Sequence, residues 1–270
     1  MRSADYYKAS HKQKDYNDNM EPTDYIYGIR AVIEAIEAGK EIDKIMIRKE
    51  LNGELAAELF ALIKRDRIYC QRVPVEKINK ITRKNHQGVV AILSSVTYHR
   101  LDHLVPELYE AGVQPFIVVL DGITDVRNFG AIARTCECAG VNGIVIPYHG
   151  SVSVSGDAMK TSAGALHHIP VCREYSIQGA VRFLKDNGYT VVAASEKADI
   201  NYTCVDYDKP LAIVMGAEDK GISPEVIRLC DRFVSIPQMG RIGSLNVSVA
   251  AGVMIYEVVR QRLKAGDEII

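Results

Sequence analysis

The length, composition and charge of the chain exclude several classes of protein. At 270 residues it is long enough for one large α/β domain or for a small domain followed by a larger one. Hydrophobic residues make up 47% of it and charged residues 25%, which argues against a disordered, collagen-like or coiled-coil protein. The formal net charge of −1 hides an asymmetry, because residues 1–100 carry 18 Lys and Arg against 14 Asp and Glu (+4), and residues 101–270 carry 15 against 20 (−5). A polyanion would therefore first meet the N-terminal part, although such an excess is also typical of an ordinary solvated surface.

Targeting segments, disulfides and metal sites are not indicated. No run approaches 18 apolar residues, and residues 1–23 lack the apolar stretch of a secretory signal. We therefore expect a soluble, cytoplasmic protein without membrane contact, with a flexible polar leader over residues 1–23. The six cysteines form no CxxC pair, and most lie in apolar runs, where a cysteine is usually a small buried side chain.

The N-terminal third predicts a small α/β domain over residues 24–96. Thr23 or Asp24 could cap a helix whose apolar residues recur at helical spacing and which ends at Gly39. The next expected elements are a strand, a helix and two further strands, at 44–47, 55–65, 68–73 and 89–93. Residues 97–113, which include a helix at 101–112, are expected to link two domains.

From Phe116 onward, short apolar runs alternate with amphipathic helices. Strands are expected at 116–120, 143–147, 190–194, 211–215 and 233–237, and helices at 128–140, 157–166, 177–187, after Pro224 and at 246–263. The alternation predicts a mostly parallel sheet covered by helices on both faces, in a domain over residues 114–270. Ligands bind such sheets at the carboxyl ends of the strands, so we expect the site in the loops after FIVVL, LAIVM and FVSI.

The first two of these loops combine glycine with polar residues. Asn128 opens the helix after FIVVL, where an N-cap role would suffice to explain it. Arg134 follows on the same apolar helix, where a guanidinium needs a partner. Gly216, close to Glu218, allows the backbone to approach a ligand, although an ordinary strand-loop-helix turn explains it as well.

The third loop has more polar residues than capping explains. Ser244, Asn246 and Ser248 lie together at the start of the last helix, and an N-cap accounts for only one of them. The same helix carries the small residues Ala250, Ala251 and Gly252, which suggest close packing against another helix of the chain or a second subunit.

Together, the three loops resemble the three sequence motifs of the SpoU (TrmH) branch of the SPOUT methyltransferases. The matching segments are NFGAIART, IVMGAEDKGIS and SIPQMGRIGSLNVSVAAG, in the right order and spacing over roughly residues 115–262. The N-terminal part, through YGIRAVIEAI and NHQGVVA, is similar to the ribosomal-protein-like substrate-binding domain of the subgroup that methylates 23S rRNA. The resemblance implies a trefoil knot in the C-terminal α/β domain, S-adenosylmethionine as cofactor, and 2′-O-methylation of a guanosine ribose in 23S ribosomal RNA.

The resemblance also implies roles for the residues that match the motifs. The positions that hold the cofactor in this family are occupied by Gly216, Ile236, Met239 and Leu245. The catalytic positions are occupied by Asn128, Arg134, Glu218, Ser244 and Asn246. The family assigns the activation of the 2′-hydroxyl to Arg134. Because arginine is not readily deprotonated, we favour a guanidinium that binds the adjacent phosphate and polarises the hydroxyl, and the proton acceptor stays open. The family habit of building each site beside a partner subunit implies a homodimer.

A polar loop in the N-terminal domain is the candidate RNA contact. Arg83, Lys84, His86 and Gln87 precede the strand at 89–93 and offer donors for phosphates and unpaired bases. Two alternatives remain open, a tRNA ribose 2′-O-methyltransferase and a non-catalytic RNA-binding protein. A nucleotide-dependent oxidoreductase is disfavoured, because the loop at Gly216 lacks the third glycine of a dinucleotide fingerprint.

Overall fold

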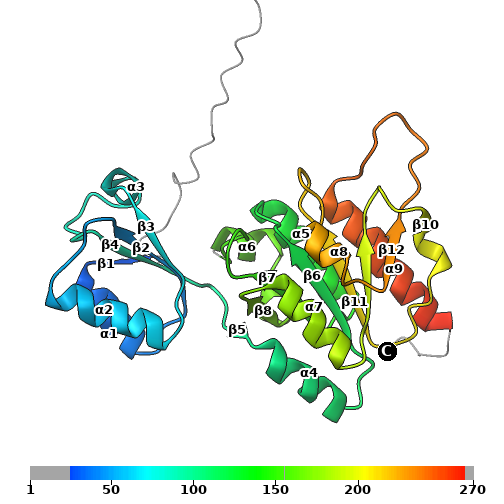
Figure 1. The fold of residues 1–270 in the computed structure, drawn as a ribbon, viewed down its shortest axis with the longest axis horizontal. Helices are drawn as coiled ribbons and strands as arrows, with labels where there is room; N and C mark the ends of the chain where they lie inside the picture. The colour runs from blue at the N-terminus through cyan, green and yellow to red at the C-terminus, as the bar shows by residue number, and fades with distance from the viewer. Residues whose placement is uncertain (1–24, 155, 265–270) are drawn as a thin grey trace, which may run out of the picture. The chain divides into compact units, whose positions relative to one another are not determined.

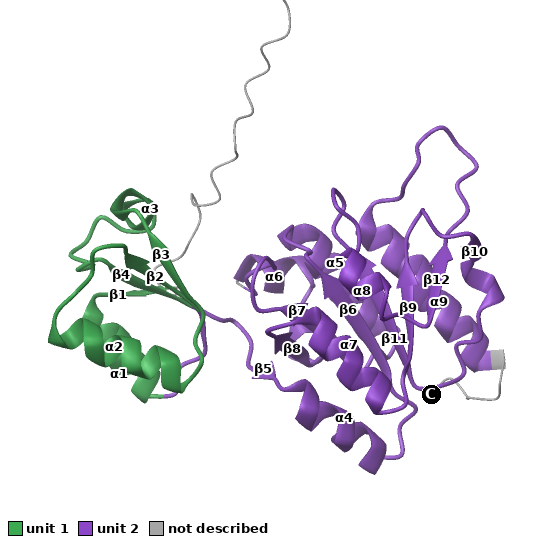
Figure 2. Cartoon of the chain, viewed as in Figure 1, with its two compact units in different colours: residues 1–38, 44–92 green, residues 39–43, 93–270 purple. Residues whose placement is uncertain are grey.

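The structure, a computed structural model, describes residues 25–154 and 156–264 and divides them into two compact units (Figure 2). Unit 1 contains residues 25–38 and 44–92, and unit 2 contains residues 39–43 and the described chain from 93 onward. The leader expected over residues 1–23 lies outside the described residues. No helix in the described part of the chain has the length and hydrophobicity needed to span a bilayer.

Unit 1 is a small sheet with helices packed against it (Figure 1). Its elements in chain order are β1 (Tyr25–Tyr27), α1 (Ile29–Glu37), β2 (Ile42–Arg48), α2 (Glu54–Arg65), β3 (Cys70–Val73), α3 (Val75–Asn79) and β4 (Val89–Leu93). The strand order is β1-β4-β2-β3, with β1 antiparallel to β4 and β2 parallel to β3. The division between the units passes through β2, whose first residues count with unit 2.

The expected start of the first helix is wrong. Residues 25–27 form a strand, and α1 begins after Gly28 rather than at a cap on Thr23 or Asp24, two positions outside the described residues. Gly28 has a φ of 93°, a value that favours glycine, and its N–H donates to the carbonyl of Val89 at 3.0 Å. This pairing holds the YIY segment against the sheet, so its tyrosines belong to a strand instead of the helix.

Unit 2 is an eight-stranded sheet among the described residues, and each strand pair defined in it is parallel. Its elements begin with β5 (Tyr98–His99), α4 (Leu101–Glu110), β6 (Phe116–Asp121), α5 (Val126–Cys138), β7 (Gly143–Pro147), α6 (Gly156–Thr161), η1 (Ala165–His167) and β8 (Val171–Glu174). They continue with α7 (Ile177–Asp186), β9 (Thr190–Ala194), β10 (Ile200–Asn201), η2 (Tyr202–Cys204), β11 (Leu211–Gly216), α8 (Pro224–Ile227), β12 (Arg232–Ser235) and α9 (Val247–Lys264). The strand order is β10-β12-β9-β11-β6-β7-β8-β5, which confirms the predicted parallel sheet.

Helices cover both faces of this sheet, and the alternating side chains of β6 pack against both layers. Val118 and Leu120 belong to the core cluster that contains α5 and α9, whereas Ile117 and Val119 belong to the cluster that contains α4 and α7. All four side chains are fully buried. Because successive side chains of a strand point to opposite faces, a continuous apolar run such as FIVVL requires a cover on each side.

The segment expected as a linker, residues 97–113, belongs to unit 2. β5 pairs with β8 at the edge of the sheet, and α4 buries Leu104 and Val105 in the cluster that contains Ile117. Leu104 packs so closely on Gly143 that a Cβ there would lie 2.7 Å from it. The division between the units therefore falls after residue 92, because α4 is amphipathic and its apolar face finds a core.

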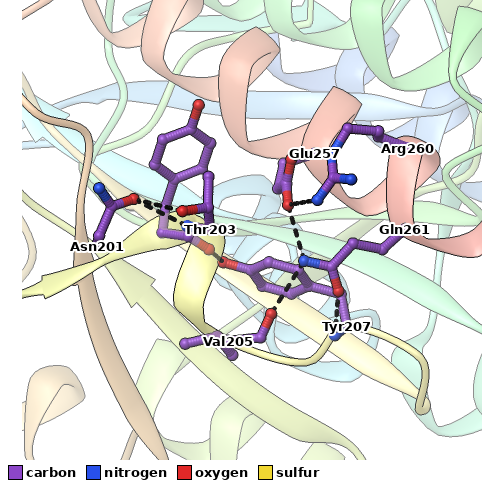
Figure 3. A network of polar contacts seen from close by, with 8 residues as sticks. Asn201, Thr203, Val205, Tyr207, Glu257, Arg260 and Gln261 are labelled. Atoms are coloured by element: carbon purple, nitrogen blue, oxygen red, sulfur yellow. Dashed lines mark hydrogen bonds and ion pairs between the residues drawn. The ribbon is translucent and has the colours of Figure 1, made fainter.

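A polar network ties the turn after η2 to α9 (Figure 3). Gln261 accepts a hydrogen bond from the backbone N–H of the fully buried Tyr207 at 3.1 Å. Its amide donates to the carbonyl of Val205 at 3.0 Å and to Glu257 at 2.8 Å. One glutamine thus satisfies backbone groups that the turn after η2 would otherwise leave unpaired.

Candidate active site

The side chain of Asn128, near the start of α5, is not used to cap that helix. The carboxylate of Asp125 accepts hydrogen bonds from the backbone N–H groups of Arg127 and Asn128, both at 2.9 Å, and so caps the helix. The alternative that Asn128 is itself the N-cap is therefore wrong. Its amide instead reaches across to the loop after β11.

Three polar side chains from three separate segments form a closed cluster, which we call the polar cluster: Asn128, Glu218 and Asn246. Asn128 Nδ2 donates to Glu218 Oε1 at 3.0 Å, and Asn246 Nδ2 donates to the same oxygen at 2.5 Å. Asn246 Nδ2 also lies 3.0 Å from Asn128 Oδ1. The three motifs that the sequence placed in separate loops therefore meet at one point, at the carboxyl edge of the sheet.

Ser248 fixes the orientation of the Asn246 amide. Its backbone N–H donates to Asn246 Oδ1 at 2.9 Å, and its hydroxyl donates to the same oxygen at 2.5 Å. A backbone N–H can only donate, so Oδ1 must face it and Nδ2 must face Glu218. The third polar residue of this loop thus has a positioning role, which explains why capping alone could not account for it.

Two pockets adjoin the polar cluster. The larger, of about 390 Å³, is lined by residues 194–197 at the end of β9, residues 215–221, Ile236, Gln238, residues 244–247 and Ala250. The smaller, of about 210 Å³, is lined by residues 122–125, Asn128, residues 217–219 and Val247. They share Ala217, Glu218, Asp219 and Val247, so the polar cluster lies at the boundary between them.

Gly216 keeps the wall of the larger pocket in shape. A Cβ at this position would lie 2.2 Å from the carbonyl carbon of Gly221 and 2.2 Å from the nitrogen of Ile222. The loop folds back on the strand end at this point, where Gly221 N donates to the carbonyl of Ala217 at 2.8 Å. We expected Gly216 to let the backbone approach a ligand, but the atoms packed against it are the backbone of its own loop.

Asp121 anchors the other end of the same loop, a role that the sequence did not suggest. Its Oδ2 accepts from both the backbone N–H and the hydroxyl of Ser223 at 2.7 Å. Ser223 precedes α8, so one carboxylate at the end of β6 holds the chain that follows the pocket wall. The signal that the sequence offered for this role was an acidic residue at the end of a buried strand.

The structure brings some of the other expected residues to the larger pocket and leaves two away from it. Ile236, Ser244 and Leu245 line the pocket beside Gly216. Met239 does not, and with 96% of its surface exposed it projects from the loop between β12 and α9. Arg134 is exposed on α5 and lines neither pocket. It lies six residues, or about 9 Å along the helix axis, from Asn128.

In unit 1, two of the four expected RNA contacts are engaged in the fold. Gln87 Oε1 accepts from the backbone N–H of Ile29 at 3.1 Å, and His86 Nδ1 accepts from the N–H of Gly88 at 2.9 Å. Arg83 and Lys84 are exposed, and Lys84 lies over the ring of Tyr27 at 5.7 Å from its centroid. This loop lines an open hollow of about 500 Å³, which Arg48 also lines.

Comparisons with known proteins place the chain in a family. The sequence model of the SpoU rRNA Methylase family matches residues 115–256, and that of the RNA 2′-O ribose methyltransferase substrate-binding domain matches residues 25–99. A protein of Staphylococcus saprophyticus assigned to the TrmH family of tRNA/rRNA methyltransferases is 37% identical over 243 residues, which cover 90% of this chain and 98% of that protein.

Two solved structures extend the likeness to the fold. An AdoMet-bound rRNA methyltransferase from Sinorhizobium meliloti aligns with a TM-score of 0.56 and 28% identity, over 87% of this chain and 86% of its own. A TrmH/SpoU tRNA modifying enzyme of A. aeolicus aligns with a TM-score of 0.52 and 30% identity, over 62% of this chain and 86% of its own. The chain belongs to the SpoU rRNA Methylase family, and it is an RNA 2′-O-ribose methyltransferase.

Proposed function

We propose that the protein transfers a methyl group from S-adenosylmethionine to the ribose 2′-oxygen of a guanosine in 23S ribosomal RNA. The observation that carries the proposal is the pair of adjoining pockets with the polar cluster at their boundary. A reaction between a cofactor and a separate acceptor needs two sites that meet at the reacting atoms.

The larger pocket suits S-adenosylmethionine in size and lining. Its volume of about 390 Å³ lies within the usual range of small-molecule sites. Met215, Ile236 and Leu245 offer apolar surface for an adenine, while the loops add carboxylates and the ammonium groups of Lys197 and Lys220 for the charged methionine end. Bound there, S-adenosylmethionine would supply an electrophilic methyl group for transfer to the ribose oxygen, with the carbon–sulfur bond broken and the hydroxyl proton lost.

The residues of the polar cluster then act as positioning and hydrogen-bonding groups. Both amides of the cluster donate to Glu218 Oε1, so the carboxylate is held in one orientation between the two pockets. Its Oε2 accepts none of these bonds and can accept a hydroxyl proton from a ribose in the smaller pocket. Ser244, which lines the larger pocket, supplies a further hydroxyl near the boundary.

The distance of Arg134 from the polar cluster supports a homodimer. The Cα of Arg134 lies about 9 Å along the α5 axis from that of Asn128, and its side chain lines neither pocket of its own chain, so we propose that it serves the site of a partner subunit. The exposed face of α9 carries Val249, Tyr256 and Leu263, seven residues apart from one to the next and 52%, 52% and 39% exposed. We propose that this face and α5 form the subunit contact.

A mixed-subunit experiment tests the dimer and the role of Arg134 together. Arg134→Ala and Glu218→Ala are each expected to be inactive. If Arg134 acts across the contact, mixing the two after unfolding and refolding restores activity, because a heterodimer contains one complete site. If Arg134 acts within its own chain, both sites of a heterodimer stay incomplete and no activity returns.

The trefoil knot remains a proposal as well. Ile236, Gln238 and residues 244–247 share one pocket with loops 194–197 and 215–221, so the chain between β12 and α9 crosses close to two earlier loops. A crystal structure traced through this crossing decides whether the last segment threads through them.

The N-terminal unit supports ribosomal RNA over transfer RNA. The rRNA methyltransferase structure matches 87% of this chain, whereas the tRNA modifying enzyme matches 62%. We propose that the exposed Arg83 and Lys84 contact RNA phosphates. Arg83→Glu with Lys84→Glu is expected to weaken RNA binding and leave S-adenosylmethionine affinity unchanged, and Arg182→Glu on the exposed side of α7 is the charge control.

The direct test compares unmodified 23S rRNA and tRNA transcripts as acceptors for labelled methyl groups. Methylation of 23S rRNA at a guanosine ribose supports the proposal in full. Methylation of tRNA alone favours the tRNA alternative, to which the 30% identity with a tRNA modifying enzyme gives specific support.

A further inference from the structure

Unit 2 contains a set of stacked aromatic rings outside the two pockets. Tyr148 follows β7 and Tyr175 follows β8, and their rings lie 4.4 Å apart with an interplanar angle of 17°. The guanidinium of Arg173 lies 5.0 Å from the centroid of Tyr148 and 4.5 Å from that of Tyr98. Contacts between these side chains therefore run from the half-buried Tyr98 through Arg173 and Tyr148 to Tyr175.

The inner part of this stack is buried and ion-paired, and its outer ring, Tyr175, is more than half exposed. The Arg173 side chain is 7% exposed and forms an ion pair with Asp43, also a residue of unit 2, at 2.8 Å. Tyr175, by contrast, is 54% exposed although Tyr148 stacks on one face of its ring. A large aromatic surface is thus presented to solvent in a preset orientation.

This surface lies on the same edge of the sheet as the polar cluster. In the parallel register, Gly216 pairs with Asp121, and the two loops of the polar cluster follow these residues. Pro147 pairs with Glu174 in the same way, and Tyr148 and Tyr175 follow them directly. β8 is two strands from β6 in the sheet order (Figure 1). Neighbouring strands lie about 4.8 Å apart, so the end of β8, which Tyr175 follows, lies about 10 Å from the end of β6, which leads to Asn128.

We propose that Tyr175 is a stacking platform for an unpaired RNA base that flanks the modified nucleotide. The inference rests on the proposed function, since it concerns the same RNA. An exposed flat ring that stacks on Tyr148, at the same edge of the sheet as the smaller pocket, matches the way proteins hold splayed single-stranded bases. It would anchor the strand next to the target and so help to place the ribose 2′-oxygen in the smaller pocket.

The chain offers a clean spectroscopic test because it contains no tryptophan. Tyr175→Trp places a single tryptophan at the stack, and its fluorescence should be quenched when single-stranded RNA of mixed sequence is added. Tyr109→Trp is the matched control, because Tyr109 is 41% exposed and donates to the carbonyl of Asn187, at the opposite edge of the sheet. Its fluorescence should not respond to the same RNA.

Binding and activity provide the second readout. Tyr175→Ala should weaken RNA binding, or raise KM for a 23S rRNA transcript, by between about 5-fold and about 100-fold, the range expected for loss of one stacked base. Tyr175→Phe should restore the wild-type value, and the affinity for S-adenosylmethionine should be unchanged in both variants. Thermal unfolding of Tyr175→Ala checks that the fold is intact.

The outcomes separate this inference from the proposed function. If the wild type methylates RNA while Tyr175→Ala has wild-type KM and the tryptophan at 175 is not quenched, the platform is wrong and the proposed function stands. Quenching by an added protein but not by RNA would likewise overturn it. If the wild type methylates no RNA, the proposed function itself fails.

Discussion

Asn246 donates a hydrogen bond to Glu218 at 2.5 Å and so joins the residue before α9 to the loop after β11, 28 residues earlier. Asn128 reaches the same carboxylate oxygen from α5, 90 residues away. The proposed methyl transfer takes place at this meeting point, which three separate segments of the chain build.

Removal of either amide from the polar cluster should impair methyl transfer much more than folding. Asn128→Ala and Asn246→Ala each remove one donor to Glu218, and we expect kcat/KM to fall by about 100-fold or more. Asn187→Ala, at the C-terminal end of α7 on the opposite edge, is the matched control and should keep its activity. Methyl transfer at wild-type rate by both cluster variants would refute the assignment.

Gly216→Ala should destabilise the loop that walls the larger pocket. The new Cβ would lie 2.2 Å from the backbone of Gly221, so the loop must move, at a cost of about 1–3 kcal/mol in the free energy of unfolding and with loss of S-adenosylmethionine affinity. Gly179→Ala is the control, because its Cβ would lie 3.5 Å from Ser176 and alanine favours the helix. Denaturant unfolding and calorimetry measure both effects. Equal stability of the two variants would contradict this account.

Glu174 should make stability depend on pH. Burial raises the pKa of its carboxyl above the ordinary value of 4.5, even though the N–H of Leu101 donates to it at 3.3 Å. The folded protein thus binds this proton more tightly than the unfolded chain, and the contribution of Glu174 to stability is lost as pH rises from 4.5 through the raised value. Glu174→Gln keeps the acceptor for Leu101 without titrating.

The difference in the free energy of unfolding between the Glu174→Gln variant and the wild type should therefore increase with pH over that interval. Urea unfolding at a series of pH values measures it. A difference that stays constant, or that decreases as pH rises, would show that burial does not govern this carboxyl.

Gln261→Leu should cost about 1–3 kcal/mol in the free energy of unfolding. The substitution leaves the N–H of the buried Tyr207 and the carbonyl of Val205 without their partner (Figure 3). Gln178→Leu on α7 makes the same change where the side chain bonds only the exposed hydroxyl of Ser176, so it should be close to neutral. Similar costs for both substitutions would indicate that the network contributes nothing specific.

The sequence predicted the sheet of unit 2 well because its strands are buried on both faces. β9 begins and ends where the TVVAA run does, and β11 differs from LAIVM by one residue. β1, β5, β8 and β10 were missed, because YIY, YH, VCRE and IN are short and derive their strand conformation from pairing partners far along the chain.

The candidate site was predictable residue by residue but not in its geometry. The motifs indicated Asn128, Glu218 and Asn246, yet only the folded chain shows that Asp125 takes the cap and releases Asn128. Met239 and Arg134 match the motifs equally well and lie away from the pockets. A motif identifies residue types, whereas the position of each side chain depends on contacts that can include a second subunit.

The most direct test of the central claim is nucleoside mass spectrometry of an unmodified 23S rRNA transcript incubated with the purified protein and S-adenosylmethionine. We predict one new 2′-O-methylguanosine with the wild type and none with Glu218→Ala at equal stability. Absence of any methylated ribose with the wild type, or a methyl group on a base instead, would contradict the account.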